Sequence, residues 1–388
     1  MSAARAGRAS LLTPVGRGAV AVVAAEGDEA FLAIDASFVA ANGRTIQGQR
    51  ADRIVFGHWI SGVHREEVIV LRGADDSVEI HCHGGVAAAE RILTALAEAG
   101  CAVESWGERL DRTAGSTIEA EAAAALAHAT TRRTAAILLN QRGGALRREV
   151  DRIRDEIAEN RLESASSKLD ALLASAPLGF HLTAPWQVAI AGRPNVGKSS
   201  LINALVGYQR AIVFDQPGTT RDVLTAETAI DGWPVRLADA AGIRETDDAL
   251  EAEGVVRARR QLAQADLALW VLDGSELVGD PLQAAQREWL NATGEAADSS
   301  RVLVVVNKAD LLAPDSRRTA SDNVRFVSAL TREGLPELIS RVGQMLVPTL
   351  PTDEAVPFTR RQIELLAAAA GSLAVGKHVD ASEALAQL

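Results

Sequence analysis

Cysteine is scarce in this chain of 388 residues, which contains only Cys82 and Cys101. Two thiols cannot build a disulfide framework, and such sparse usage fits a reducing compartment. Long hydrophobic runs are also lacking, since no stretch of about eighteen apolar residues occurs. The first residues, Met1 to Arg5, carry no apolar secretory segment. These absences predict a soluble, cytoplasmic protein with no membrane partner.

An excess of positive charge is missing as well, because the formal net charge is −11. Sequence-independent binding to nucleic acid depends on neutralising phosphates, so this balance argues against it as a general activity. Arginines do crowd residues 132–154, but acidic residues between 149 and 159 dilute them. We interpret that stretch as a solvated helix face. The length allows two or three domains, each with its own core.

A phosphate-binding loop is the most informative feature present. Residues 192–199 read Gly-Arg-Pro-Asn-Val-Gly-Lys-Ser and match G-x-x-x-x-G-K-[ST], after an apolar run at 188–191 and before a helical pattern. The glycines let backbone N–H groups point at phosphates, Lys198 can reach the β and γ oxygens, and the Ser199 hydroxyl can ligate Mg²⁺. A tight strand-to-helix turn without a ligand is the alternative. The motifs that follow favour the nucleotide.

The identity of the base is indicated downstream, where a buried strand at 304–306 runs into Asn307-Lys308-Ala309-Asp310. A carboxylate at Asp310 would accept from both guanine N1–H and the exocyclic amine, and adenine offers neither donor there. Bound ATP would therefore leave Asp310 desolvated and unpaired. The sequence predicts guanine. A second strand at 324–327 ends in Ser328 and Ala329, where backbone N–H groups could meet guanine O6.

A D-x-x-G motif, Asp239 to Gly242, lies between the phosphate loop and the base motif. Asp239 is expected in the Mg²⁺ shell, and the Gly242 N–H is expected to face the γ-phosphate. Four motifs in this order, at spacings that suit one nucleotide, make a GTP site the preferred interpretation.

The distribution of periodic segments predicts three domains. Short strands at 20–23, 54–56, 68–71 and 78–81 and a helix over 86–99 indicate a small α+β module. Residues 118–176 and 360–388 are helical in pattern, 177–185 are predicted to be a loop, and 186–347 alternate strands with helices. We predict an α/β P-loop GTPase domain, with a doubly wound and mainly parallel sheet, inserted in a helical domain behind the N-terminal α+β module. The predicted bounds are 1–113 for the module, 114–184 and 352–388 for the split helical domain, and 185–351 for the GTPase domain.

Several longer motifs resemble the MnmE family of tRNA-modifying GTPases, also called TrmE. They are Thr13 to Ala21, His83-Gly84-Gly85, Gly192 to Leu201, Gly218 to Leu224 and Ala241 to Thr246. The nucleotide motifs are shared with sister GTPases, and the leading T-P-x-G-R-G makes the resemblance specific. The resemblance covers nearly the whole chain. It implies hydrolysis of GTP to GDP and phosphate in wobble-uridine modification, with a homodimer, an MnmG-like flavoprotein and tRNA as partners.

The resemblance also implies how hydrolysis is assisted. Ras-like enzymes carry a water-positioning glutamine after D-x-x-G, whereas this chain has Ile243 there. In the family a K⁺ ion supplies charge at the phosphates instead, and Glu251 aligns with the residue that positions water through a bridge. The implied K⁺ ligands are groups of Asn195, Phe214, Gln216 and Thr219. The implied Mg²⁺ ligands are Ser199, Thr220 and Asp239, and the implied catalytic residues are Glu251, Lys198 and Asn195. The expected nucleotide contacts are Asn195, Val196, Gly197, Lys198, Ser199, Ser200, Gly218, Thr219, Thr220, Asp239, Ala240, Ala241, Gly242, Asn307, Lys308, Asp310, Ser328 and Ala329.

Departures from the family pattern concern its modification chemistry. Members bind formyl-tetrahydrofolate, but Ala24 and Ala114 stand where an arginine and a lysine are expected, and Asp75 replaces a glutamate. Without the two cations the folate carboxylates lose their partners, which argues against folate binding. The sequence also ends at Leu388 without the C-I-G-K cysteine motif, so a divergent, C-terminally short member is predicted. Cys82, between two histidines, is interpreted as a packed thiol and not as a metal ligand.

Two functions therefore stay open at this point. One is an enzyme of tRNA wobble-uridine modification, which whole-chain similarity favours. The other is a regulatory or assembly GTPase paralogue that has lost the folate and cysteine chemistry. A ribosome-assembly role is disfavoured because no KH-like G-x-x-G segment follows the GTPase domain.

Overall fold

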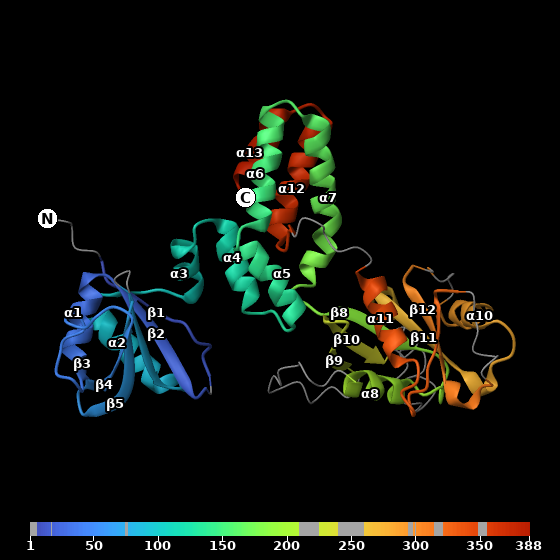
Figure 1. Cartoon of the computed structure of the whole chain (residues 1–388), viewed down its shortest axis with the longest axis horizontal. Coiled ribbons are helices and arrows are strands. Elements are labelled where there is room, and N and C mark those ends of the chain that lie inside the picture. Colours follow the sequence, from blue (N-terminus) through green and yellow to red (C-terminus); the bar gives the residue numbers. More distant parts are fainter. Residues whose placement is uncertain are drawn as a thin grey trace. The chain divides into compact units, whose positions relative to one another are not determined.

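The computed structural model describes residues 6–16, 18–73, 77–208, 225–239, 260–293, 298, 300–313, 321–347 and 355–388. The chain divides into two compact units, Met1–Ser116 and Thr117–Leu388. Figure 1 labels their helices and strands. Within the described ranges, no helix has both the length and the apolar character needed to span a membrane.

The first unit is built on a seven-stranded sheet in the order β3-β4-β5-β6-β2-β1-β7. The predicted strands and the helix from residue 86 are confirmed, whereas the short β1, β3 and β7 were not predicted. The strands are β1 (Arg8–Leu11), β2 (Val20–Glu26), β3 (Phe38–Ala40), β4 (Arg53–Ser61), β5 (His64–Arg72), β6 (Ser77–His83) and β7 (Ala102–Val103), and the helices are α1 (Asp28–Ser37), α2 (Val86–Glu98) and α3 (Trp106–Thr113). Runs of two to four residues are too short to show a period of two, so sequence patterns miss them.

The core of the first unit lies where α1 and α2 pack on the sheet. Val23, Ile34, Ile80 and Leu96 are fully buried there. In β6 the alternation places Val78, Ile80 and Cys82 on the same inner face. Cys82 is buried, and its Sγ donates to the backbone oxygen of Ala21 at 3.6 Å, as expected for a packed thiol.

Helices dominate the start and the end of the second unit. They are α4 (Thr117–Leu126), α5 (Arg132–Arg142), α6 (Ala145–Ala158), α7 (Leu162–Phe180), α12 (Arg360–Ala374) and α13 (His378–Ala386). Although far apart in sequence, α6, α7, α12 and α13 lie side by side (Figure 1). Leu146, Ile153, Leu169 and Leu366 are fully buried in the core between them.

One sequence prediction in this region is wrong. Residues 177–180 were predicted to begin a loop at Pro177, but α7 continues through Pro177 to Phe180. A proline inside a helix costs about 3 kcal/mol. Packing outweighs that cost, because Ala176 and Leu178 are buried and Gly179 touches Pro357 so closely that a Cβ would lie 1.8 Å from the Pro357 oxygen.

The second sheet has six strands in the order β13-β12-β11-β8-β10-β9, and only β9 runs antiparallel to its neighbour. The predicted mainly parallel sheet is confirmed. Its strands are β8 (Trp186–Ala191), β9 (Thr225–Ile230), β10 (Trp233–Asp239), β11 (Leu267–Asp273), β12 (Val302–Asn307) and β13 (Val324–Phe326); the helices are α8 (Lys198–Tyr208), α10 (Pro281–Thr293) and α11 (Leu335–Leu346), with 3₁₀ turns η1 (Gly274–Glu276) and η2 (Ala309–Leu311). All of β12 is buried, as expected of a parallel strand covered on both faces.

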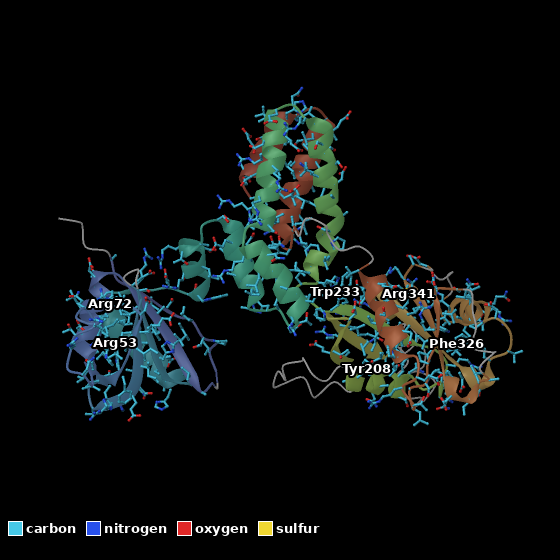
Figure 2. The ribbon with its side chains drawn as sticks, viewed as in Figure 1. Arg53, Arg72, Tyr208, Trp233, Phe326 and Arg341 are labelled. Carbon is cyan, nitrogen blue, oxygen red and sulfur yellow. The ribbon has the colours of Figure 1, made fainter. Side chains whose placement is uncertain are left out.

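Helix α5 contacts the turn between β9 and β10 through the side chain of Arg133. The guanidinium of Arg133 lies 4.8 Å from the ring centroid of Trp233, which is labelled in Figure 2, and Arg133 Nη1 lies 3.0 Å from Asp231 Oδ2. Trp233 is buried and begins β10, and the same strand ends at Asp239. A cation–π contact and an ion pair thus tie a helix of the predicted helical domain to the strand that presents a predicted Mg²⁺ ligand.

Candidate nucleotide site

Two glycines in the loop between β8 and α8 adopt positive φ angles and lie too close to neighbouring strands for a side chain. Gly192 has φ +138° and Gly197 has φ +93°. A Cβ on Gly192 would lie 2.2 Å from the Val271 oxygen, and one on Gly197 would lie 2.3 Å from Asn307 Nδ2. Any larger side chain would therefore push the loop away from the neighbouring strands. The loop keeps its backbone N–H groups close to the carboxyl edge of the sheet.

The Lys198 side chain folds back onto this loop and bonds to its backbone oxygens. Its side chain is largely buried, and its Nζ donates to the backbone oxygens of Gly192 at 3.1 Å and Arg193 at 2.9 Å. Burial lowers the pKa of Lys198, and the nearby Asp239 carboxylate opposes that shift. The ammonium group therefore lies against the loop carbonyls, close enough to Asp239 for that carboxylate to favour its charged form.

Asn307 connects three of the predicted motifs. The residue is 2% exposed, its Nδ2 donates to the Val196 oxygen at 2.9 Å, and its Oδ1 accepts from the Ala329 N–H at 3.1 Å. The sequence predicted a contact with the nucleotide for each of these residues. The structure shows that Asn307 also fixes the phosphate loop and the Ser328-Ala329 turn relative to each other.

Asp273 is a site residue that the sequence analysis missed. It ends β11, directly opposite Asn307 in the ladder, and its Oδ2 accepts from Lys308 Nζ at 2.5 Å. Burial raises the pKa of Asp273, but hydrogen bonds from Lys308 and Ser275 outweigh it, so the pKa lies below its ordinary value. The ion pair orients Lys308, whose φ is +60°. The sequence did contain a signal for Asp273, because a carboxylate that directly follows a buried apolar strand resembles the position of Asp310 after β12.

The remaining base-site residues lie in the turns after β12 and β13. Asp310 is half-buried in η2, and this turn is fixed by the Ala309 N–H, which donates to the Val327 oxygen at 3.0 Å. Ser328 is fully buried, and its Oγ accepts from the Thr331 N–H at 3.1 Å. Ser328 therefore shapes the turn with its side chain.

Two of the predicted Mg²⁺ ligands, Ser199 and Asp239, lie in the described ranges. Ser199 is exposed in the first turn of α8. Asp239 ends β10 in register with Ile190, next to the strand that leads into the phosphate loop. A hydroxyl and a carboxylate are oxygen donors of the kind that Mg²⁺ prefers. The predicted K⁺ ligand Asn195 is exposed at φ +63°.

Ser200 follows Ser199 in α8 and is also exposed. The other predicted site residues lie outside the described ranges: Phe214, Gln216, Gly218, Thr219, Thr220, Ala240, Ala241, Gly242 and Glu251. Their roles stay predictions. Among the residues that the structure does describe, no group of three or more His, Cys, Asp or Glu side chains is arranged to hold a metal ion.

Two family models match parts of the chain. The model described as 50S ribosome-binding GTPase matches residues 187–308, which include the phosphate loop, Asp239 and Asn307. The model described as GTP-binding protein TrmE N-terminus matches residues 9–114, which form most of the first unit.

Curated relatives match most of the chain under one name, tRNA modification GTPase MnmE. The Geobacillus thermodenitrificans protein is 36% identical over 87% of this chain and 81% of its own. The Lactiplantibacillus plantarum protein is 33% identical over 87% and 80%, and the Lactococcus lactis subsp. lactis protein is 32% identical over 96% and 90%. Taken with the geometry of the loop, these matches show that the chain belongs to the MnmE family of tRNA modification GTPases.

Proposed function

We propose that this protein binds GTP, hydrolyses it to GDP and phosphate, and acts in tRNA modification at the wobble uridine. The observation that carries the GTP site is the pair of hydrogen bonds that Asn307 makes, donating to the Val196 oxygen and accepting from the Ala329 N–H. These bonds hold the phosphate loop next to the turn after β13, which supports a site where one nucleotide contacts both. Family membership supports the tRNA part. The relatives described above share that name, and none of them favours the regulatory or assembly alternative.

The described residues suggest a division of roles. The Asp310 carboxylate would select guanine, and the ion pair with Asp273 would hold the Lys308 stem beside the base. Lys198 would exchange its bonds to loop carbonyls for bonds to phosphate oxygens. Ser199 and Asp239 would hold Mg²⁺, which neutralises charge on the phosphates when bound. Glu251 is proposed to orient water and Asn195 to bind K⁺.

Partners are proposed from the family resemblance. A second copy of the chain would pair through the GTPase domain, and an MnmG-like flavoprotein and tRNA would complete the modifying complex. We also propose the three-domain division at 1–113, 114–184 with 352–388, and 185–351.

A complementation experiment tests the proposed function. The chain is expressed in bacteria that lack their own MnmE gene, and wobble uridines are measured by mass spectrometry of digested tRNA. We expect the modified nucleoside to return with the unaltered chain and not with Lys198→Ala, whose GTPase rate should fall about a hundredfold or more. Purified protein that hydrolyses GTP while tRNA in these cells stays unmodified would refute the tRNA role and leave the GTPase role intact.

Folate binding gives a separate prediction. Titration calorimetry with micromolar 5-formyl-tetrahydrofolate should show no saturable heat. Ala24 is 1% exposed in β2, and Ala114 caps the end of α3, so neither position supplies a cation for a carboxylate. A relative that has arginine and lysine at these positions serves as the positive control. Tight binding by this chain would show that the carboxylate argument is wrong.

A further inference from the structure

The hairpin of β9 and β10 links the candidate nucleotide site to a distant part of the second unit. Its open end holds Asp239, a predicted Mg²⁺ ligand, and Thr225, which follows the segment containing Thr220 in the sequence. Strand β10 runs over seven residues from Trp233 to Asp239, a length of about 20 Å. Its residues from Trp233 to Ala238 all pair with β9. The two strands are therefore expected to move together.

The closed end of the hairpin is a tight turn made by Asp231 and Gly232. Both residues have positive φ, +49° and +79°, as the favoured two-residue hairpin loop requires. Asp231 also packs closely against α11, since a Cβ on Gly343 would lie 2.7 Å from the Asp231 Cβ. The turn is therefore a fixed end of the hairpin.

Arg133 of α5 makes several contacts with this turn. A Cβ on Gly232 would lie 3.4 Å from both the Cβ and the Cδ of Arg133, so the stem of Arg133 packs next to the glycine. Arg133 Nη1 donates to the Asp231 backbone oxygen and, at 3.0 Å, to Asp231 Oδ2. The guanidinium lies 4.8 Å from the ring centroid of the buried Trp233. One side chain of the predicted helical domain thus holds both the turn and the first residue of β10.

These contacts restrain the hairpin more than they stabilise the fold. The ion pair is partly solvated, with 36% of the Arg133 side chain and 49% of the Asp231 side chain exposed. Ion pairs at such positions contribute little to stability. Strand β9, however, is the last in the order of its sheet, so within the described residues β10 is its only strand neighbour. The contacts of Arg133 with the turn add a restraint to a strand that is hydrogen-bonded on one side.

The strand beside β10 is contacted at the same end of the sheet. Trp186 begins β8 and lies in register with Val235 of β10. The ring of His181, which directly follows α7, stacks on the Trp186 ring with centroids 3.5 Å apart and an interplanar angle of 19°. The strands that lead to the phosphate loop and to Asp239 therefore both contact residues of the predicted helical domain at their amino ends.

We propose that Arg133 is a positioning residue for GTP hydrolysis. By holding the closed end of the β9–β10 hairpin, it fixes how the open end presents Asp239, and it passes changes at the nucleotide on to α5. Coupling between two sites is reciprocal, so a contact through which the nucleotide acts on α5 also lets α5 act on the nucleotide site. The inference rests on the proposed GTPase function, and it adds that a residue of α5 controls the rate.

Steady-state kinetics of the full-length chain test this role. We expect Arg133→Ala to lower kcat about tenfold, a size typical of residues that couple two sites, and to raise the Mg²⁺ concentration that half-saturates the rate. KM for GTP should stay nearly unchanged, because the contacts of Arg133 involve neither the phosphate loop nor the base motif. Arg133→Lys should restore most of the rate, since lysine keeps a cation beside Asp231 and over the Trp233 ring. Arg132→Ala, at the neighbouring exposed arginine, is the matched control.

A second measurement follows the closed end of the hairpin itself. The six tryptophans are replaced by 5-fluorotryptophan, and Trp233→Phe identifies the Trp233 ¹⁹F signal by its loss. Adding aluminium fluoride to the GDP-bound chain should shift this signal, although Trp233 lies the length of β10 away from Asp239. The shift should be smaller in Arg133→Ala, which has no guanidinium over the ring. A contact that only packs α5 against the sheet would leave the signal in place.

Asp231→Asn replaces Arg133→Ala if the other five ¹⁹F signals show that variant to be unfolded. Asparagine is tolerated at positive φ, so the turn is kept while the charge beside Arg133 is removed, and kcat should again fall. A folded variant with the unaltered kcat and Mg²⁺ requirement, or an equal loss in Arg132→Ala, would overturn the positioning role and leave the GTPase function standing. An unaltered chain that does not hydrolyse GTP would instead refute the proposed function, and this inference with it.

Discussion

Asp310→Asn is expected to move the nucleotide preference from GTP toward XTP. The substitution turns one acceptor oxygen into a donor that faces the guanine amine, whereas xanthine presents an oxygen there. Hydrogen bonds to charged groups contribute about 1.5–3 kcal/mol, so GTP affinity should fall by a factor of about ten to a hundred. Competition binding with GTP, XTP and ATP measures the change.

In the structure, the contacts that fix the loop around Asp310 do not depend on the side chain that this substitution changes. The η2 turn is fixed by backbone bonds and by the Lys308 to Asp273 ion pair, and neither involves the Asp310 side chain. Asp322→Asn, an exposed carboxylate in the same domain, serves as the matched control and should leave all three affinities unchanged. Unaltered GTP affinity in Asp310→Asn would mean that the base site has been assigned to the wrong residues.

GTP hydrolysis is expected to be faster in KCl than in NaCl at equal ionic strength. Ile243 cannot orient water, so we expect K⁺ to supply the charge that assists the reaction. Losing one electrostatic contact of this kind typically lowers the rate about a hundredfold or more. Asn195→Ala should therefore abolish the response to K⁺, and it should leave nucleotide affinity nearly intact because backbone N–H groups and Lys198 make most of the phosphate contacts.

Asn195 is well placed for this test. Its amide makes no hydrogen bond to any described residue, and its φ of +63° holds it at an exposed bend of the loop. Because alanine is strained at that φ, Asn195→Gly is a second variant that removes the amide without strain. Asn203→Ala, an exposed position in α8, is the control.

K⁺ with GDP and aluminium fluoride should also drive dimerisation of the unaltered chain. Equal rates in both salts, with a monomer in each, would contradict the mechanism.

The nucleotide motifs could be identified from sequence because their chemistry depends on short spacings. Lys198 and Ser199 are neighbours in one loop, and the residues of N-K-x-D follow one strand, so no distant contact is needed to recognise them. The doubly wound sheet was predictable for a related reason. Buried parallel strands are continuous apolar runs, as at 302–306, and their carboxyl ends must meet at one edge.

Contacts between residues far apart in sequence were decided only by the tertiary structure. Asp273 and Lys308 are 35 positions apart, and Arg133 and Asp231 are 98 apart. No local pattern specifies such pairs, because they follow from strand register and from how the helices pack. The same reason explains the error at Pro177, where burial of Ala176 and Leu178 outweighed the local preference of proline. Sequence alone determined which chemistry the loop motifs supply, and packing decided how Asn307, Asp273 and Arg133 hold those motifs together.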